Sequence, residues 1–502
     1  MSCFLTPDEL SKTTRASRLR GESPIPAHAV TNGEFTPPPR SELQRRFERR
    51  LRELAEPLAR KQGLSRRKFL KTAAGMSAAF VAMNEVFGPH FVVDRAEAAD
   101  PERAAARARV LAKQFVFDVQ LHFIRDYNRD ARFKRFLGFR NYTGRFLDPK
   151  IGESASNELL KFPNFVKEVF LDSDTKVGML TGSPNDDIQD WHLNNDEIVA
   201  ACKTVNKEAG STRLLGHAVM APNQPGWMDE IDRVHKLYKP AAWKGYTMGD
   251  PSGPSKYMWR LDDEKLMYPA YEKMVKAGVR IVCVHKGLLP DNAEEVMPGA
   301  TAHSDVSDLG KAAKDWPQIS WVVYHSGFRP APRPNAAYEK QFEDTGRIDW
   351  VSDLAKIPET FGVKNVYGEI GSSFAFTCIT NPRVCAGMLG TLVKGLGADH
   401  VLWGTDSIWY GSPQWQIDAL RRTEIPIDLQ KKFGFAPLGD ADGEVKRAIL
   451  GRNAARLHGV RVARIDGAPS YQRDRFAMLK EEYERLGPNR SNIAYGYIAR
   501  ES

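Results

Sequence analysis

Residues Val279–Gly287 read VRIVCVHKG, and Ile319–Gly327 read ISWVVYHSG. Each stretch begins with a nearly continuous apolar run and then places a histidine directly after it. Apolar runs that lack alternating polar residues are typical of parallel strands that are covered on both faces. The two stretches therefore predict an α/β fold in which polar side chains gather at the carboxyl ends of parallel strands.

Six further runs of the same kind accompany these two. The eight predicted strands are Phe115–Val119, Val177–Leu180, Leu215–Met220, Ala242–Thr247, Val279–Val284, Ile319–Tyr324, Asn365–Ile370 and His400–Gly404. Helix-like segments such as Asp229–Tyr238, Glu264–Ala277 and Asp308–Asp315 lie between them. Strand–helix alternation repeated eight times predicts a (β/α)₈ TIM barrel over residues 115–460.

The chain has 502 residues, so it is long enough for a large barrel with appendages. We expect a disordered basic leader over 1–64, an export signal over 65–98 and a tail over 461–502 with a helical run at Ser470–Leu486. The tail either packs on the barrel or serves in homo-oligomer contacts. A long insertion after the first strand, Phe123–Asp172, contains the aromatic and basic stretch Arg125–Arg145 and is expected at the substrate mouth.

The formal net charge is +9, but the excess is unevenly placed. Residues 1–98 hold 17 of the 72 basic and 11 of the 63 acidic side chains, so the remainder is nearly neutral. A phosphate-binding surface, and with it a nucleic-acid partner, is therefore not expected. No uninterrupted apolar run is long enough for a transmembrane helix, so an integral membrane protein is not expected either.

A basic segment, Ser65–Lys71 (SRRKFLK), precedes the modest apolar run Thr72–Met83 and the small-residue pattern Ala96-Glu97-Ala98. This order is typical of a secretory signal, and the paired arginines resemble the twin-arginine export signal. The resemblance implies the twin-arginine translocation machinery as a partner and a periplasmic or exported location. The arginines of such signals normally lie close to the start, whereas 64 residues precede this segment. The alternative is a basic cluster that happens to precede a buried helix.

Polar side chains at four predicted strand ends are candidates for a metal site. Gln120 and His122 follow the first strand and point to the same face because they are two residues apart. His285, His325 and Asp406 follow the fifth, sixth and eighth strands. Imidazole and carboxylate donors suit Zn²⁺, Mn²⁺ or Fe²⁺, and a bound water would have its pKa lowered toward ~7. For Asp406 alone, capping of the following helix is an alternative.

Other polar residues near these strand ends have open roles. We expect Asp118 to be a structural acceptor and Lys244 to face solvent rather than bridge two metals, so one metal ion is expected. Glu369 is either a general acid/base or the salt-bridge partner of Lys286 or Arg329. These three residues are predicted to bind substrate or to support the residues that do.

The motifs in this order resemble the amidohydrolase superfamily, specifically the amidohydrolase-related branch that includes aminocarboxymuconate-semialdehyde decarboxylase and the resorcylate-type decarboxylases. Asp118–His122 resembles the opening D-x-H-x-H motif, Gly404-Thr405-Asp406 the final G-[ST]-D, and Ile449–Leu457 the closing helix. The resemblance implies that His122, His285 and Asp406 bind the metal. It also implies that His325 is an acid/base residue beside the bound water and that Asp406 accepts a proton from that water.

Gln120 departs from the motif because the hydrolases of this family have a histidine there. An amide oxygen is a weaker, neutral donor, which favours harder ions such as Mn²⁺ over Zn²⁺. With Asp406 as the one anionic ligand, the site would keep a positive charge that favours an anionic substrate group. Three functions remain open: a metal-dependent hydrolase of an ester, lactone or amide of a small substrate, a metal-dependent decarboxylase of an aromatic or unsaturated acid, and a degenerate exported binding protein.

Overall fold

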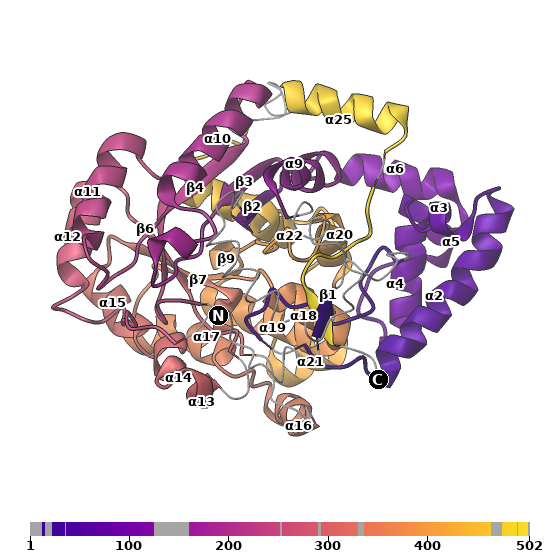
Figure 1. The fold of residues 1–502 in the computed structure, drawn as a ribbon. Helices are drawn as coiled ribbons and strands as arrows, with labels where there is room; N and C mark the ends of the chain where they lie inside the picture. The colour runs from indigo at the N-terminus through magenta and orange to yellow at the C-terminus, as the bar shows by residue number, and fades with distance from the viewer. Residues whose placement is uncertain are drawn as a thin grey trace.

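The computed structural model describes residues 13–15, 23–35, 37–124, 160–251, 254–289, 293–329, 336–462, 474–488 and 490–499. Eight parallel strands form one sheet in sequence order, as the strand–helix alternation predicts. The strands are β2 (Phe117–Leu121), β3 (Val177–Leu180), β4 (Leu214–Val219), β5 (Ala242–Tyr246), β6 (Ile281–His285), β7 (Ser320–Tyr324), β8 (Val366–Glu369) and β9 (Val401–Leu402). The predicted (β/α)₈ barrel is confirmed (Figure 1).

The ring of strands closes where the last strand meets the first. The backbone N–H of Val119 donates to the carbonyl of Trp403 at 3.0 Å, and that of His122 donates to Ser407 at 2.7 Å. A parallel bridge also joins Leu121 to Ser407. Closure therefore places the residues that follow β2 directly beside those that follow β9.

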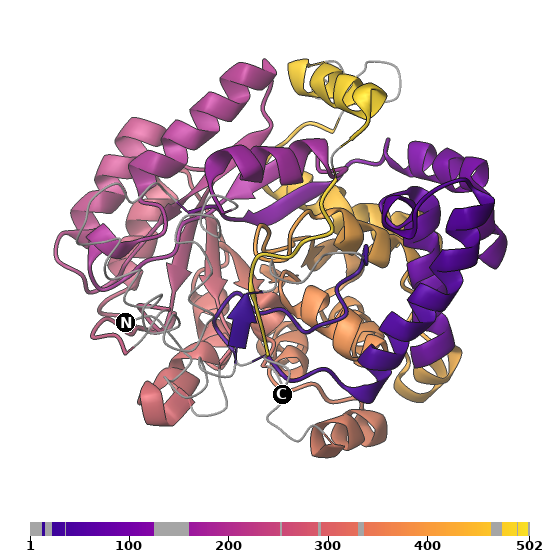
Figure 2. The same cartoon turned by 45° about the vertical axis from the view of Figure 1, so that its right-hand side comes forward.

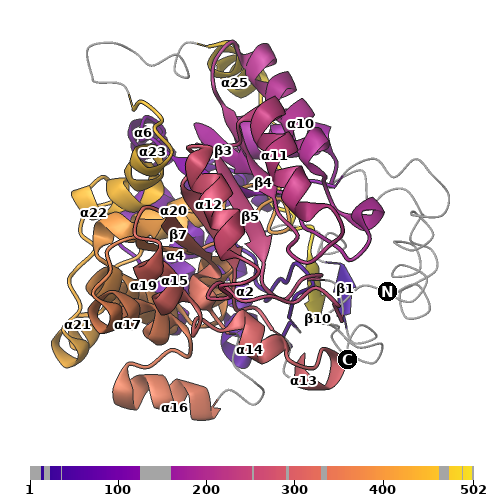
Figure 3. The same ribbon diagram turned by 90° about the vertical axis from the view of Figure 1, so that its left-hand side faces the viewer.

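Helices cover the outside of the barrel, and Figure 3 shows α10, α11 and α12 along its β3–β5 side. The interior is filled by alternate inward-facing residues, among them Phe117, Met179, Cys283 and Tyr324. Between β2 and the tail, the α-helices of the described residues are α9 (Phe162–Val166), α10 (Asn195–Ala209), α11 (Trp227–Tyr238), α12 (Tyr268–Lys276), α13 (Ala293–Val296), α14 (Ala300–Ser304), α15 (Leu309–Asp315), α16 (Ala336–Thr345), α17 (Val351–Phe361), α18 (Ser373–Thr380), α19 (Pro382–Leu396), α20 (Gln414–Arg422), α21 (Ile427–Phe433), α22 (Glu444–Arg447) and α23 (Asn453–Leu457).

Among the described residues, five helices precede the barrel and pack on one side of it (Figures 1 and 2). They are α2 (Glu42–Lys61), α3 (Arg66–Phe69), α4 (Ala73–Phe87), α5 (Arg95–Ala99) and α6 (Pro101–Leu111). Ser41 begins α2 with a capping box that Gln44 completes, and the helix buries Phe47 and Leu51 on one face. The expectation of a disordered leader is therefore wrong for residues 42–61. Charged residues on the solvent face of an amphipathic helix caused the error.

The predicted signal segment is also folded against the protein. The apolar run lies in α4, whose Ala74–Met83 portion is almost entirely buried, and the Ala96-Glu97-Ala98 pattern lies in α5. The carboxylate of Glu97 pairs with the guanidinium of Arg422 in α20, with one N–O contact at 3.2 Å. The structure thus contains the buried helix of the alternative interpretation, while the export address itself stays a prediction.

The tail packs on the barrel through α25 (Arg475–Leu486), which confirms the predicted helical run. Asp474 accepts from Nε and Nη2 of Arg213 at 2.6 and 2.9 Å, just before β4. Farther on, β10 (Tyr497–Ala499) pairs antiparallel with β1 (Thr13–Arg15). Described segments near the two termini therefore pair with each other, whereas homo-oligomer contacts stay a prediction.

The aromatic and basic stretch Arg125–Arg145, which was expected at the substrate mouth, lies outside the described residues. Across the described ranges, no helix has both the length and the apolar character needed to cross a bilayer.

Candidate metal and catalytic site

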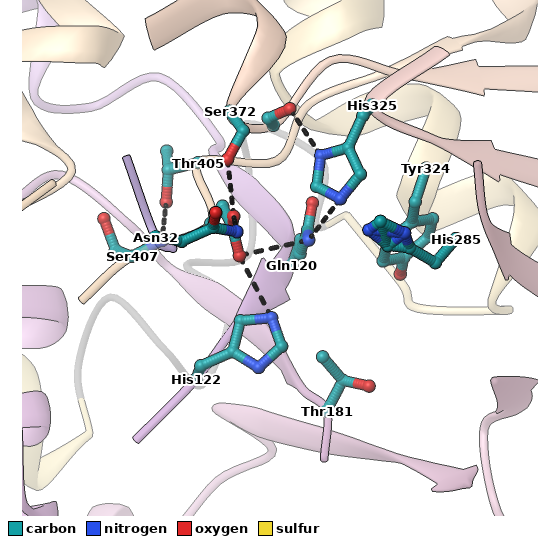
Figure 4. A network of polar contacts seen from close by, with 12 residues as sticks. Asn32, Gln120, His122, Thr181, His285, Tyr324, His325, Ser372, Thr405 and Ser407 are labelled. Carbon is teal, nitrogen blue, oxygen red and sulfur yellow. Dashed lines mark hydrogen bonds and ion pairs between the residues drawn. The ribbon is translucent and has the colours of Figure 1, made fainter. Parts of the chain in front are cut away.

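The carboxyl ends of β2 and β9 bring together three of the predicted site residues. Nε2 of His122 lies 3.0 Å from Oδ1 of Asp406, and Nε2 of Gln120 donates to the same oxygen at 3.1 Å. All three side chains are buried. In Figure 4 the side chains of Gln120 and His122 point toward each other at this end of the barrel.

His325 and His285 extend this network across the barrel mouth. Nε2 of His325 lies 3.4 Å from Nε2 of Gln120, while its Nδ1 lies 2.8 Å from the carbonyl oxygen of Gly371. The rings of His285 and His325 are 4.7 Å apart, and Tyr246 stacks on His285 at 4.8 Å. The five residues that the sequence assigned to the metal site therefore form one cluster.

Backbone strain marks the same strand ends. His325, Ser326, Ser372 and Asp406 all have φ between 50° and 59°, in the left-handed region that non-glycine residues rarely adopt. Each such residue costs on the order of 1 kcal/mol. Strained backbone conformations of this kind cluster at functional sites, where they hold side chains in orientations that a relaxed backbone would not give.

Two residues that the sequence did not single out fix the position of Asp406. The hydroxyl of Ser372 donates to Oδ2 of Asp406 at 2.5 Å and lies 2.7 Å from the hydroxyl of Tyr410. Ser372 follows the Gly371 turn after β8. A serine after a glycine is too common a pattern to indicate this role from the sequence.

The N-terminal segment enters the site, which the sequence did not predict. Nδ2 of Asn32 donates to Oδ2 of Asp406 at 3.0 Å and to Oε2 of Glu34 at 2.7 Å. Oε1 of Glu34 lies 3.1 Å from Nε2 of His285. The proline-rich composition of residues 24–39 concealed this contribution, since nothing in it indicates a partner in the barrel.

Burial controls the protonation of the cluster. It lowers the pKa of His285 well below its ordinary value, and it lowers the pKa of His325 to about 4 despite the opposing charge of Asp406. The two imidazoles are therefore neutral near pH 7, the form that binds metal ions. Burial disfavours the charged form of Asp406, but the hydrogen bond and charge of His122 outweigh it and bring that pKa down to about 2.

Burial acts in the opposite direction on two other carboxyls. It raises the pKa of Glu34 to about 8, with a further contribution from the negative charge of Asp406. It raises the pKa of Glu369 to about 8 as well, against hydrogen bonds from the backbone N–H groups of His325 (2.9 Å) and Gly371 (2.5 Å). Both acids would be stabilised as carboxylates by a cation.

The structure confirms the expected role of Asp118 but not that of Lys244. Asp118 accepts from Thr405 and from the backbone N–H of Gln120, so it is the structural acceptor that was expected. The expectation of a solvent-facing Lys244 is wrong: the residue is fully buried, with Nζ 3.3 Å from the centre of the Tyr324 ring. Lys244 and Tyr246 are two residues apart in β5, so both point into the barrel. Burial lowers the pKa of the Lys244 amine to about 8.

The predicted partners of Glu369 lie elsewhere. Nζ of Lys286 donates to Oδ2 of Asp308 at 2.8 Å in a fully buried pair, and the guanidinium of Arg329 lies 5.2 Å from the centre of the Trp350 ring. Within the described part of the chain, neither cation pairs with Glu369. The salt-bridge alternative for Glu369 is therefore wrong, because both cations have nearer partners.

Glu369 nevertheless touches the cluster. A Cβ at Gly404 would stand 1.9 Å from Oε1 of Glu369, and one at Gly371 would stand 2.4 Å from Oε1 of Gln120. Glycine at both positions leaves the room that these two side chains need.

The donor set fits a divalent cation. Among the described residues, no hydrogen-bond donor reaches the buried Oε1 of Gln120, and no partner reaches Nδ1 of His285. Neutral imidazoles, an amide oxygen and a carboxylate are suitable ligands for Zn²⁺ or Mn²⁺. Candidate ligand atoms of Glu34, His285 and His325 also lie within 4.8 Å of one another.

The match to a protein family covers most of the barrel. Residues 213–460 match the amidohydrolase family model, and this match supports the amidohydrolase superfamily. The matched region includes His285, His325 and Asp406 but begins after Gln120 and His122. No curated protein matches the chain.

The solved structures that match this chain are distant in sequence. An uncharacterised TIM-barrel protein from Bordetella bronchiseptica is 15% identical, covering 69% of this chain and 98% of that chain, with a TM-score of 0.44. A putative 2-pyrone-4,6-dicarboxylic acid hydrolase from Pseudomonas putida is 14% identical, covering 70% and 99%, with a TM-score of 0.39. The 5-carboxyvanillate decarboxylase of Novosphingobium aromaticivorans, with bound manganese, is 13% identical, covering 69% and 98%, with a TM-score of 0.41.

Proposed function

We propose that the protein is a metal-dependent hydrolase of the amidohydrolase superfamily that cleaves an ester, lactone or amide bond of a small substrate. The observation that carries this proposal is the convergence of Gln120, His122, His285, His325 and Asp406 at the carboxyl ends of the barrel strands. In a TIM barrel this end is where the chemistry takes place. The amidohydrolase family match over residues 213–460 supports the same conclusion.

His122, His285 and Asp406, with the amide oxygen of Gln120, would hold one divalent ion, Zn²⁺ or Mn²⁺. Such an ion, when bound, lowers the pKa of a coordinated water toward ~7 and polarises a carbonyl group. Asp406 is ionised and is fixed by Ser372, so one of its oxygens can take the proton that the water gives up.

His325 is suited to move a proton at Nε2. Its Nδ1 lies 2.8 Å from the Gly371 carbonyl, an acceptor, so Nδ1 carries the proton of the neutral ring and Nε2 has the free lone pair. Nε2 can therefore receive a proton and return it to a leaving group. The raised pKa of Glu369 and its contact with the backbone of His325 support a positioning role for Glu369.

A decarboxylase is the second candidate. Gln120 offers an oxygen where a histidine is usual, and Asp406 adds another, so the donor set favours a hard ion such as Mn²⁺. In this case the ion would hold the carboxylate of an aromatic or unsaturated acid. His325, after taking a proton from water at Nε2, would pass that proton to the carbon from which carbon dioxide leaves.

A substrate panel separates these functions. The protein reconstituted with Mn²⁺ or Zn²⁺ should hydrolyse a member of a panel of aryl esters, lactones and amides, and Asp406→Asn should not. Release of carbon dioxide from hydroxybenzoates without hydrolysis would establish the decarboxylase instead. Metal well below one equivalent and no turnover would support the degenerate binding protein.

We also propose export through the twin-arginine pathway, on the basis of Ser65–Lys71. Arg67 and Lys68 are exposed on α3, whereas Phe69 and Leu70 are buried. Replacing Arg66 and Arg67 together with lysine should retain the protein in the cytoplasm, and cell fractionation measures the outcome. Equal export of the variant would contradict this address.

A further inference from the structure

We propose that Glu34, in the segment before the helices and the barrel, is a ligand of the same divalent cation as His285. The two residues are 251 positions apart in the chain, and their side chains meet at the barrel mouth. This inference rests on the proposed metal site, but it adds a ligand that neither the barrel motifs nor the family match contains.

The position of Glu34 is the first argument. Its Oε1 lies 3.1 Å from Nε2 of His285, and ligand atoms of Glu34, His285 and His325 all lie within 4.8 Å of one another. Two atoms bound to one ion at about 2.0–2.2 Å each are normally separated by about 3 Å. The Glu34–His285 separation therefore suits two ligands of a single ion.

The segment that carries Glu34 is firmly held, which is the second argument. Thr31 exchanges two backbone hydrogen bonds with Tyr497, at 2.9 and 2.8 Å. Phe35 is buried and contacts Phe376 edge-on at 5.2 Å. The side chain of Asn32 caps the turn by accepting from the backbone N–H of Glu34 at 3.1 Å. Contacts on both sides of Glu34 thus fix the carboxylate at the mouth.

The turn is built for this geometry. Gly33 has φ +110°, in the region that glycine adopts without strain, and its N–H donates to the hydroxyl of Thr31 at 3.0 Å. Asn32 then reaches Asp406 while Glu34 reaches His285. One short turn of the N-terminal segment therefore contacts residues from two different strand ends.

Charge is the third argument. His122, His285 and Gln120 are neutral donors when they bind a metal, so Asp406 alone would leave a divalent ion with a net charge of +1. A Glu34 carboxylate neutralises that charge and supplies a hard oxygen donor, which offsets the replacement of a histidine by Gln120. A consequence is that the neutral site no longer selects for an anionic substrate group.

The contribution of Glu34 has a consequence for processing. Cleavage after Ala98 would remove Glu34 together with the helices that pack beside the barrel. The proposal therefore requires that the active protein keep the segment that contains Glu34, whether or not it is exported.

The test compares metal binding by the full chain and its variants. Glu34→Gln is isosteric and removes the charge, Glu34→Asp keeps a carboxylate, and Glu359→Gln removes an exposed charge from α17 as the control. Mn²⁺ is titrated into chelator-treated protein and followed by electron paramagnetic resonance, with metal per chain measured by mass spectrometry. We expect Glu34→Gln to weaken Mn²⁺ binding about tenfold or more, Glu34→Asp to weaken it less, and Glu359→Gln to leave it unchanged.

The outcomes separate this proposal from the proposed function. Equal Mn²⁺ affinity of the wild type and Glu34→Gln would overturn the role of Glu34, and faster turnover by that variant would show that the segment covers the site instead. Weaker binding by Glu34→Gln in a protein that turns over no substrate of the panel would support Glu34 and contradict the hydrolase. Thermal unfolding of the metal-free variants shows whether each one is folded.

Discussion

Nε2 of His122 lies 3.0 Å from Oδ1 of Asp406, and this contact joins the end of the first barrel strand to the end of the last. It exists because the backbone N–H of Val119 in β2 donates to Trp403 and that of His122, just after β2, donates to Ser407, which closes the ring. The same carboxylate accepts from Gln120, Ser372 and Asn32. The Asp406 carboxylate thus contacts four other side chains of the site.

Asp406→Asn should abolish activity with little change in the fold. The amide is isosteric, so it fills the same space, but it is neutral and cannot take a proton from water. We expect turnover to fall at least ~100-fold and Mn²⁺ content to fall with it. Steady-state kinetics and elemental analysis measure both effects. Asp399→Asn, an exposed change just before β9, is the matched control, and equal activity of the two variants would contradict the role of Asp406.

Gln120→His should increase zinc retention. An imidazole binds Zn²⁺ more strongly than an amide oxygen, and position 120 already faces Asp406 and His325. We expect the variant to keep about one equivalent of zinc through dialysis conditions that remove it from the wild type. Zinc content by elemental analysis is the measurement. An unchanged zinc content would mean that the side chain at this position does not contact the ion.

The strands were predictable from the sequence because parallel strands that are covered on both faces consist of short, nearly continuous apolar runs, which form a distinctive pattern. The predicted Val177–Leu180 matches β3 residue for residue, and Phe115–Val119 is displaced by two residues from β2. The carboxyl ends of all eight strands lie at one end of the barrel, so the sequence alone predicted that His285, His325 and Asp406 lie close together.

Lys244 and Glu34 could not be placed in this way. The rule that lysine faces solvent fails for Lys244 because the rings of Tyr324 and Tyr246 accommodate its amine inside the barrel. Glu34 lies in a proline-rich segment without periodicity, and its partner His285 is fixed only by tertiary packing. Local patterns carry no information on such distant contacts.

Glu97→Gln should destabilise the protein and tests whether the helices before the barrel are part of the fold. The Glu97 side chain and that of Arg422 are each only 7% exposed, and Ser77 donates to the same carboxylate at 2.7 Å. Removing one charge of a buried pair leaves the other uncompensated, so we expect a loss of about 3 kcal/mol in the free energy of unfolding. Urea denaturation measures it.

The control for this prediction is Glu359→Gln, which should change stability by less than about 0.5 kcal/mol because the residue is exposed. Equal stability of the two variants would mean that the Glu97–Arg422 contact does not hold α5 against α20.

Glu168→Gln should change how stability depends on pH. Glu168 is buried beside Tyr495, whose hydroxyl donates to Oε1 at 2.6 Å, and burial raises the pKa of this carboxyl from 4.5 to about 7. The folded state therefore binds the proton more tightly than the unfolded state, and the stability that this carboxyl contributes falls as pH rises toward and through 7. Glutamine does not titrate, so between pH 5 and pH 8 the free energy of unfolding of the variant should rise by about 2 kcal/mol relative to that of the wild type.

Urea denaturation at both pH values measures the difference. The free energy of unfolding of the control Glu359→Gln should change with pH in the same way as that of the wild type. A Glu168→Gln curve that also stays parallel would show that this carboxyl does not titrate in the expected range.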